Sequence, residues 1–180
     1  MLVSLFSSAY VLLRYIVIDN VAWQHFPSFL MNKIVALVAV VCLVVAALSF
    51  YKKKRELAKF WGLSSLHFAA LHILFSLALM GPKMYPELYQ YGETNLKGEL
   101  LILFGVLASY IYWCLYRNES LRRVKIFSLL LSSFLLAHLV SLGLGSWLSL
   151  NNWLINLPSV SFLSFVIVLV SFTVYAISDE

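Results

Sequence analysis

Two histidines occupy matching positions in two long apolar stretches of this chain. His72 follows Lys59 by 13 residues, and His138 follows Lys125 by 13 residues. If each lysine marks the membrane surface where a helix starts, a rise of about 1.5 Å per residue puts both imidazoles about 20 Å above it. Two neutral imidazoles at one level can bind one iron from opposite sides of a porphyrin, as in a b-type haem. A mononuclear zinc site would need three or four ligands, and this level offers two.

Both histidines also have an interpretation without a cofactor. A histidine inside an apolar helix can be a core residue hydrogen-bonded to backbone or serine, although ionisable groups at such depth usually serve a function. The matched depth favours ligation for His72 and His138. Small residues share a helix face with His72, at spacings of three and four: Gly62, Ser65, Ala69 and Ser76. We expect them to leave room for a flat macrocycle, although alone this stripe favours close helix–helix packing.

Two further histidines and one arginine are weaker candidates. His67 lies five residues before His72 and about 140° around the helix from it, so a hydrogen-bonded core or cavity residue is favoured over a ligand. His25 could reach a haem edge or a partner protein, but a solvated loop residue is favoured. Arg14, inside the first apolar stretch, either snorkels to the membrane interface or pairs with a haem propionate, because guanidinium grips carboxylate in a bidentate way.

The composition of the chain predicts that these side chains lie within a membrane. Of the 180 residues 62% are hydrophobic and 12% are charged, against about 45–50% and about 25% in soluble domains. The chain is therefore predicted to be an integral membrane protein. A crossing helix needs about 20 apolar residues, and six stretches qualify, the first and fourth being short: 2–18, 33–50, 60–80, 100–116, 124–146 and 159–177. We expect an all-α six-transmembrane-helix bundle forming one domain over residues 1–180. The first stretch lacks the features of a cleaved signal and is read as retained.

The basic residues predict the orientation of this bundle. Nine of the 13 lysines and arginines fall between stretches two and three or around the start of stretch five. By the positive-inside rule both termini are cytoplasmic, and stretches three and five run in parallel from the cytoplasm outward. The net charge of +5 therefore indicates topology and contact with anionic membrane lipid, not binding of nucleic acid.

Three segments carry a resemblance to a known family. KFWGLSSLHFAALHILFSLAL (59–79), SLRRVKIFSLLLSSFLLAHLVSLG (120–143) and WQHFPS (23–28) resemble motifs of the ferric reductase-like transmembrane family. The pattern is most similar to the haem-binding membrane subunit of the periplasmic methionine-sulfoxide reductase system (MsrQ-like). The resemblance spans most of residues 20–145 and implies a bacterial inner membrane protein.

The resemblance also implies how many haems to expect. Two-haem relatives carry a second histidine 13 or 14 residues toward the cytoplasm on each ligand helix. Here those positions are Ala58 or Lys59 and Val124 or Lys125, so one outer haem, held by His72 and His138, is implied. The chain departs from the MsrQ-like pattern at Lys125, where that pattern usually keeps a histidine.

The expected function is that of a single-haem membrane cytochrome. Electrons would come from a quinol or a cytoplasmic flavin-linked reductase, with a flavin or a quinone as a possible second cofactor. They would pass to a periplasmic redox partner, which by resemblance is a methionine-sulfoxide reductase. Two alternatives stay open: reduction of ferric chelates or oxygen species at the outer haem edge, and a non-haem transporter or assembly factor. The last would need acidic residues within the spans, and only Asp19 and Glu99 occur, both at helix ends.

Overall fold

Helices make up most of the chain that the structure describes. The structure is a computed structural model, and it describes residues 2–18, 28–123, 125–147 and 157–178. Five helices are long and apolar enough to cross a membrane: α2 (Ser28–Tyr51), α3 (Arg55–Leu79), α4 (Leu96–Arg117), α6 (Lys125–Trp147) and α7 (Val160–Ile177). A short helix, α5 (Glu119–Arg123), joins α4 to α6. The predicted all-α membrane class is confirmed.

The first apolar stretch is shorter than the other spans. It forms α1 (Leu2–Leu12), which continues as a π-helical segment, η1 (Leu13–Ile18). The apolar helix there runs from Leu2 to Val17, and at about 1.5 Å per residue it falls short of a hydrocarbon core about 30 Å thick. Five spans, not six, therefore reach crossing length among the described residues.

Several helices begin earlier than the apolar pattern predicted. α2 starts at Ser28 and not at residue 33, and α3 starts at Arg55 and not at residue 60. A helix closes its hydrogen bonds within its own backbone, so polar residues such as Ser28 and Lys59 extend it past the apolar core. The first turns of these helices therefore carry the polar side chains closest to the membrane surface.

A small hairpin fixes the start of α4. It follows a 3-10 turn, η3 (Pro86–Leu88), and pairs β1 (Tyr89–Gln90) with β2 (Glu93–Thr94) in antiparallel register. The Asn95 side chain then caps α4 by accepting a hydrogen bond from the Gly98 backbone N–H at 3.0 Å. A Cβ on Gly98 would lie 2.6 Å from the Leu88 carbonyl oxygen, so only glycine allows this approach. The contact sets how deep the next turns of α4 lie in the bundle.

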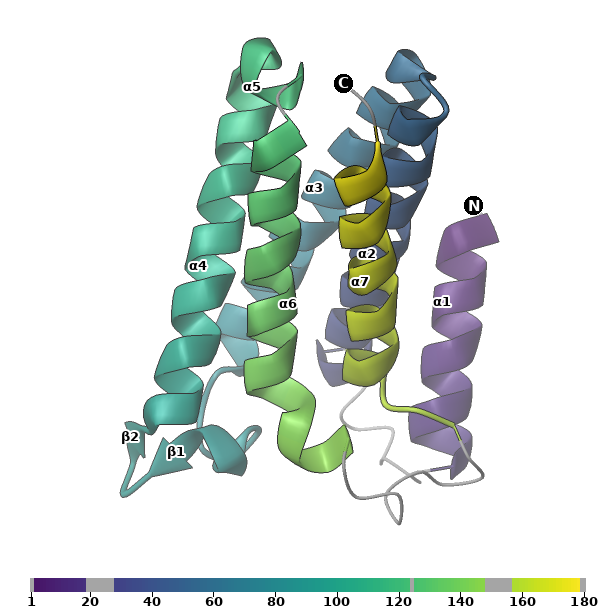
Figure 1. The fold of residues 1–180 in the computed structure, drawn as a ribbon. Coiled ribbons are helices and arrows are strands. Elements are labelled where there is room, and N and C mark those ends of the chain that lie inside the picture. The colour runs from purple at the N-terminus through teal and green to yellow at the C-terminus, as the bar shows by residue number, and fades with distance from the viewer. Residues whose placement is uncertain (1, 19–27, 124, 148–156, 179–180) are drawn as a thin grey trace.

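The helices pack in the order α3, α2, α7, α6, α4, and α1 adds to the outside of α2 (Figure 1). α2 is central and contributes the largest share of buried residues. Among the described residues, α3 packs extensively on α2 but has at most marginal contact with α4 and α6. The two helices that carry His72 and His138 are therefore not packed directly against each other.

The bundle has two chemically different ends. We call the end with β1 and β2 the hairpin end, at the bottom of Figure 1. The opposite end, which carries α5, we call the basic end after its cations: Lys52, Lys53, Lys54, Arg55, Lys59 and Arg117. Two candidate sites follow, one toward each end.

Candidate functional site

His72 is held from α2 by a buried asparagine. The Nδ1 atom of His72 lies 2.6 Å from Oδ1 of Asn32, a residue only 2% exposed. The Asn32 amide nitrogen in turn donates to Ser76 Oγ at 3.2 Å, one turn beyond His72 on α3. With Oδ1 as the acceptor, Nδ1 of His72 carries the proton. This orientation leaves the Nε2 lone pair of His72 available as a ligand.

His138 is held in the same way by the backbone of α4. Its Nδ1 lies 2.9 Å from the carbonyl oxygen of Leu101. A carbonyl oxygen only accepts, so Nδ1 of His138 carries the proton and Nε2 has the free lone pair. The ring also lies against Gly105, where an added Cβ would be 3.1 Å from Nδ1 and 3.3 Å from Cε1. A glycine is therefore needed for the ring to approach α4 this closely.

The two imidazoles have the same tautomer and lie in the same region of the bundle. Both are half-buried toward the hairpin end, and they lie close enough to interact electrostatically. Metal-binding histidines usually give the other ring N–H to a carbonyl or carboxylate, which fixes tautomer and orientation. This donor set suits two axial imidazoles of a haem. Among the described residues, no cluster of three or more His, Cys, Asp or Glu could hold a metal.

The small-residue stripe on α3 mostly contacts α2. Ser65 is 1% exposed and donates to the Ala39 carbonyl oxygen at 2.6 Å, and Ser76 is bonded to Asn32. Ala69 packs against the cluster formed by α2, α4 and α6, while Gly62 has open space where a Cβ would project. The serines therefore serve helix–helix contact, and Gly62 belongs to a cavity at the basic end described below.

The remaining histidines lie away from this pair. His67 is exposed on the surface of α3, which corrects the expectation of a core or cavity residue. α2 covers only one side of α3, so a residue about 140° around from His72 points out of the bundle. His25 lies outside the described residues.

Arg14 is buried beside Tyr15, whose ring packs edge-on against Phe29 at the start of α2. It is 6% exposed within the π-helical segment, and its guanidinium carbon lies 5.8 Å from the centre of the Tyr15 ring. Its side chain is therefore covered by other protein groups. α1 packs on α2 at the edge of the bundle opposite α4 (Figure 1).

Lys125 lies at the start of α6 and contacts the end of α7. The Lys125 ammonium donates to the carbonyl oxygens of Ala176 and Ser178, both at 3.0 Å. These carbonyls belong to the C-terminal end of α7, where a cation satisfies free acceptors and the helix dipole. Lys125 therefore ties α6 to α7.

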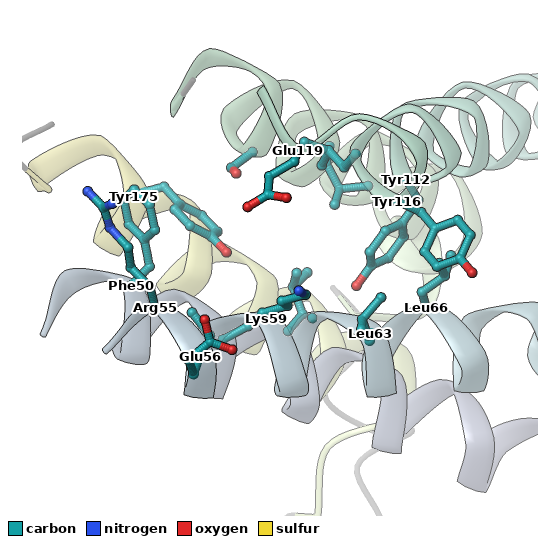
Figure 2. Close-up of a pocket in the computed structure, with 17 residues that line it drawn as sticks. Phe50, Arg55, Glu56, Lys59, Leu63, Leu66, Tyr112, Tyr116, Glu119 and Tyr175 are labelled. Carbon is teal, nitrogen blue, oxygen red and sulfur yellow. The ribbon is translucent and has the colours of Figure 1, made fainter. Parts of the chain in front are cut away.

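The basic end contains a cavity of about 380 Å³. Its wall is mostly apolar and comes from all five long helices. The polar groups that line it are Arg55, Glu56, Lys59, Tyr112, Tyr116, Glu119, Ser128 and Tyr175. Figure 2 shows Glu119 on one side, facing Glu56 and Lys59 on α3. Its size and apolar wall with a few polar groups are typical of a site for a small organic molecule.

One polar atom in this wall lacks a partner. Tyr112 is 9% exposed, and its buried hydroxyl makes no hydrogen bond among the described residues. It lies beside Ser65, whose own proton goes to Ala39. A buried hydroxyl without a partner costs about 1–3 kcal/mol, so this atom is suited to a ligand with an acceptor oxygen.

Sequence reasoning missed the residues that orient the two histidines. Asn32 gave a signal, because a polar amide sits near the start of an apolar stretch. Leu101 gave no signal in the sequence, because it acts through its backbone carbonyl. Gly105 could not be told apart from the other small residues of the spans. Only the packing of α2 on α3 and of α4 on α6 identifies them.

Comparison with protein-family models, with curated proteins and with solved structures finds no significant match for this chain. The fold and the site define a helical membrane protein with a pair of oriented imidazoles, and the similarity to the ferric reductase-like family stays a prediction.

Proposed function

We propose that this protein is a membrane cytochrome that binds one b-type haem between His72 and His138. The observation that carries the proposal is the shared hydrogen-bonding state of the two rings, each with Nδ1 bound to an oxygen of a neighbouring helix. A bound haem would supply one-electron transfer. Asn32 and Leu101 would keep each ring in one tautomer, and Gly105 would let His138 sit against α4.

The proposal includes an orientation in the membrane. Six crossing helices, with α1 and η1 as a short first span, would leave both termini in the cytoplasm together with the basic end. The hairpin end would then face the periplasm of a bacterial inner membrane. Electrons would leave there for a periplasmic partner protein, which the family resemblance suggests is a methionine-sulfoxide reductase.

The cavity at the basic end supports the choice of donor. It reaches Leu66 on α3, six residues before His72, so about 9 Å of helix rise separates the two levels. From Lys59 the rise would be about 20 Å. A donor that enters this cavity would therefore deliver electrons over a much shorter path than one held at the surface.

The charges at the cavity favour quinol over flavin as that donor. Arg55 and Lys59 are balanced by Glu56 and Glu119, which suits a neutral head group better than an anionic flavin phosphate. A quinol becomes a quinone by releasing two protons and two electrons, and a single haem would accept these electrons one at a time. The two carboxylates can take up the protons, and the Tyr112 hydroxyl can donate to a quinone carbonyl.

Visible spectroscopy tests the haem. Protein expressed with added haem and purified in detergent should show a b-type spectrum that shifts on reduction with dithionite. His72→Ala and His138→Ala should each abolish the six-coordinate spectrum. His67→Ala is the matched control, because His67 is exposed on the same helix. A colourless wild-type preparation, or a full six-coordinate spectrum in His138→Ala, would overturn the proposal.

Stopped-flow reduction tests the donor. A short-chain quinol should reduce the wild-type protein faster than reduced flavin mononucleotide does. Gly62→Leu should slow the quinol reaction at least tenfold, because Gly62 lines the cavity and has open space for a side chain. Gly81→Leu is the control, since Gly81 also has open space but lies outside the cavity. A flavin rate lost in Gly62→Leu while the quinol rate is kept would assign the cavity to flavin.

A further inference from the structure

Lys33 is a cation held between aromatic rings and close to His72. It directly follows Asn32 on α2, and it is half-buried. Its ammonium nitrogen lies 5.2 Å from the centre of the Phe29 ring and 5.9 Å from that of Tyr85. Aromatic faces attract a cation, so the two rings hold the ammonium at a defined position near the hairpin end.

Among the described residues, no carboxylate lies close enough to form an ion pair with this ammonium. Glu87 is the carboxylate close enough to influence Lys33, but no ion pair forms between Lys33 and any carboxylate of the described residues at a 4.0 Å limit. Charges removed from water are normally paired, because an unpaired buried charge is strongly unfavourable. The position of Lys33 therefore suits an anionic group that comes with a ligand.

Lys33 also lies within electrostatic range of His72, and Tyr85 lies beside Asn32. The same short stretch of α2 thus holds His72, a proposed iron ligand, through Asn32 and carries a cation at Lys33. Burial raises the pKa of the Tyr85 phenol, so this neighbour stays neutral and does not compete for the ammonium. A haem bound by His72 carries two propionates on one edge, and that edge needs a cation.

We infer that Lys33 binds a propionate of the haem held by His72 and His138. This inference rests on the proposed function and names the residue that fixes the haem's edge toward the hairpin end. It replaces Arg14, the cation that the sequence suggested, because Lys33 is the cation within electrostatic range of His72. Lys33 would be a positioning residue, and the iron would be bound by the histidines alone.

The experiment compares charge at three positions and measures two properties of the haem-loaded protein. Lys33→Met should lose haem to apomyoglobin about tenfold faster than wild type, the value for a lost charge-assisted hydrogen bond. It should also lower the midpoint potential, because a cation near the iron favours the reduced state. Lys33→Arg should restore both properties, whereas Arg14→Met and the exposed Lys83→Met should leave both unchanged.

The outcomes separate this inference from the proposed function. Wild-type protein without haem overturns both. Haem-loaded wild type with unchanged haem loss and potential in Lys33→Met overturns the role of Lys33 alone, and changes in Arg14→Met instead assign the propionate to Arg14. If Lys33→Met does not give a monodisperse protein, Lys33→Gln against Lys33→Arg provides the same comparison, and equal haem loss in the two overturns the inference.

Discussion

The imidazole of His72 and the side-chain oxygen of Asn32 lie 2.6 Å apart, which joins α3 to α2 at the level of the proposed haem. Two residues 40 positions apart thus form one unit. The asparagine is almost completely buried, and a buried amide in an apolar span is costly unless its polar atoms are used. Here both ends of the amide are bonded, to His72 and to Ser76.

Asn32→Leu should therefore loosen the haem without removing an iron ligand. Loss of such a supporting bond typically costs 10–100-fold in affinity, and we expect haem transfer to apomyoglobin to accelerate by at least tenfold. Asn32→Asp, which keeps an acceptor oxygen, should be affected less. Ser49→Ala is the control, because it removes another buried polar group of α2, near the basic end. Equal haem retention in Asn32→Leu and wild type would contradict the role of this bond.

Gly105→Ala should shift the ring of His138 without replacing this histidine. The new methyl group would lie 3.1 Å from Nδ1, so the ring must move by a few tenths of an ångström and its bond to Leu101 weakens. We expect faster haem loss and a changed low-spin signal in electron paramagnetic resonance. Gly62→Ala, where the methyl group meets open space, should keep the wild-type signal. An unchanged signal in Gly105→Ala would show that the ring does not depend on this contact.

Lys125→Met should lower stability and leave the haem spectrum as it is. The side chain loses two hydrogen bonds to the end of α7. Because one of these bonds is exposed, we expect a loss of only about 1 kcal/mol in the free energy of unfolding. Thermal unfolding in detergent measures this loss, and the reduced spectrum serves as the internal control. A changed spectrum would mean that Lys125 acts at the haem and not at α7.

Tyr112→Phe should slow reduction by quinol without lowering the stability of the protein. Removing a hydroxyl without a partner should leave the free energy of unfolding unchanged or raise it by about 1 kcal/mol. Quinol-dependent reduction should nevertheless slow, because the bound quinone would lose its donor. Tyr116→Phe, at a more exposed position in the same cavity, should change neither. A quinol rate equal to that of the wild type in Tyr112→Phe would exclude the hydroxyl from binding.

The sequence by itself determined the class of the protein and the two imidazoles worth testing. Hydrophobic composition and span length depend on water and lipid and not on which helices are neighbours, so they can be read from the chain alone. The equal spacing of His72 from Lys59 and of His138 from Lys125 likewise depends only on helix rise.

Only the tertiary structure decided what surrounds those imidazoles. Asn32, Leu101 and Lys33 act across helix interfaces, and one of the three acts through a backbone carbonyl that every residue possesses. The exposure of His67 and the burial of Arg14 follow from which side of α3 and α1 meets α2. Hydrogen bonds act over about 3 Å, so their partners are fixed by helix packing and not by distance along the chain.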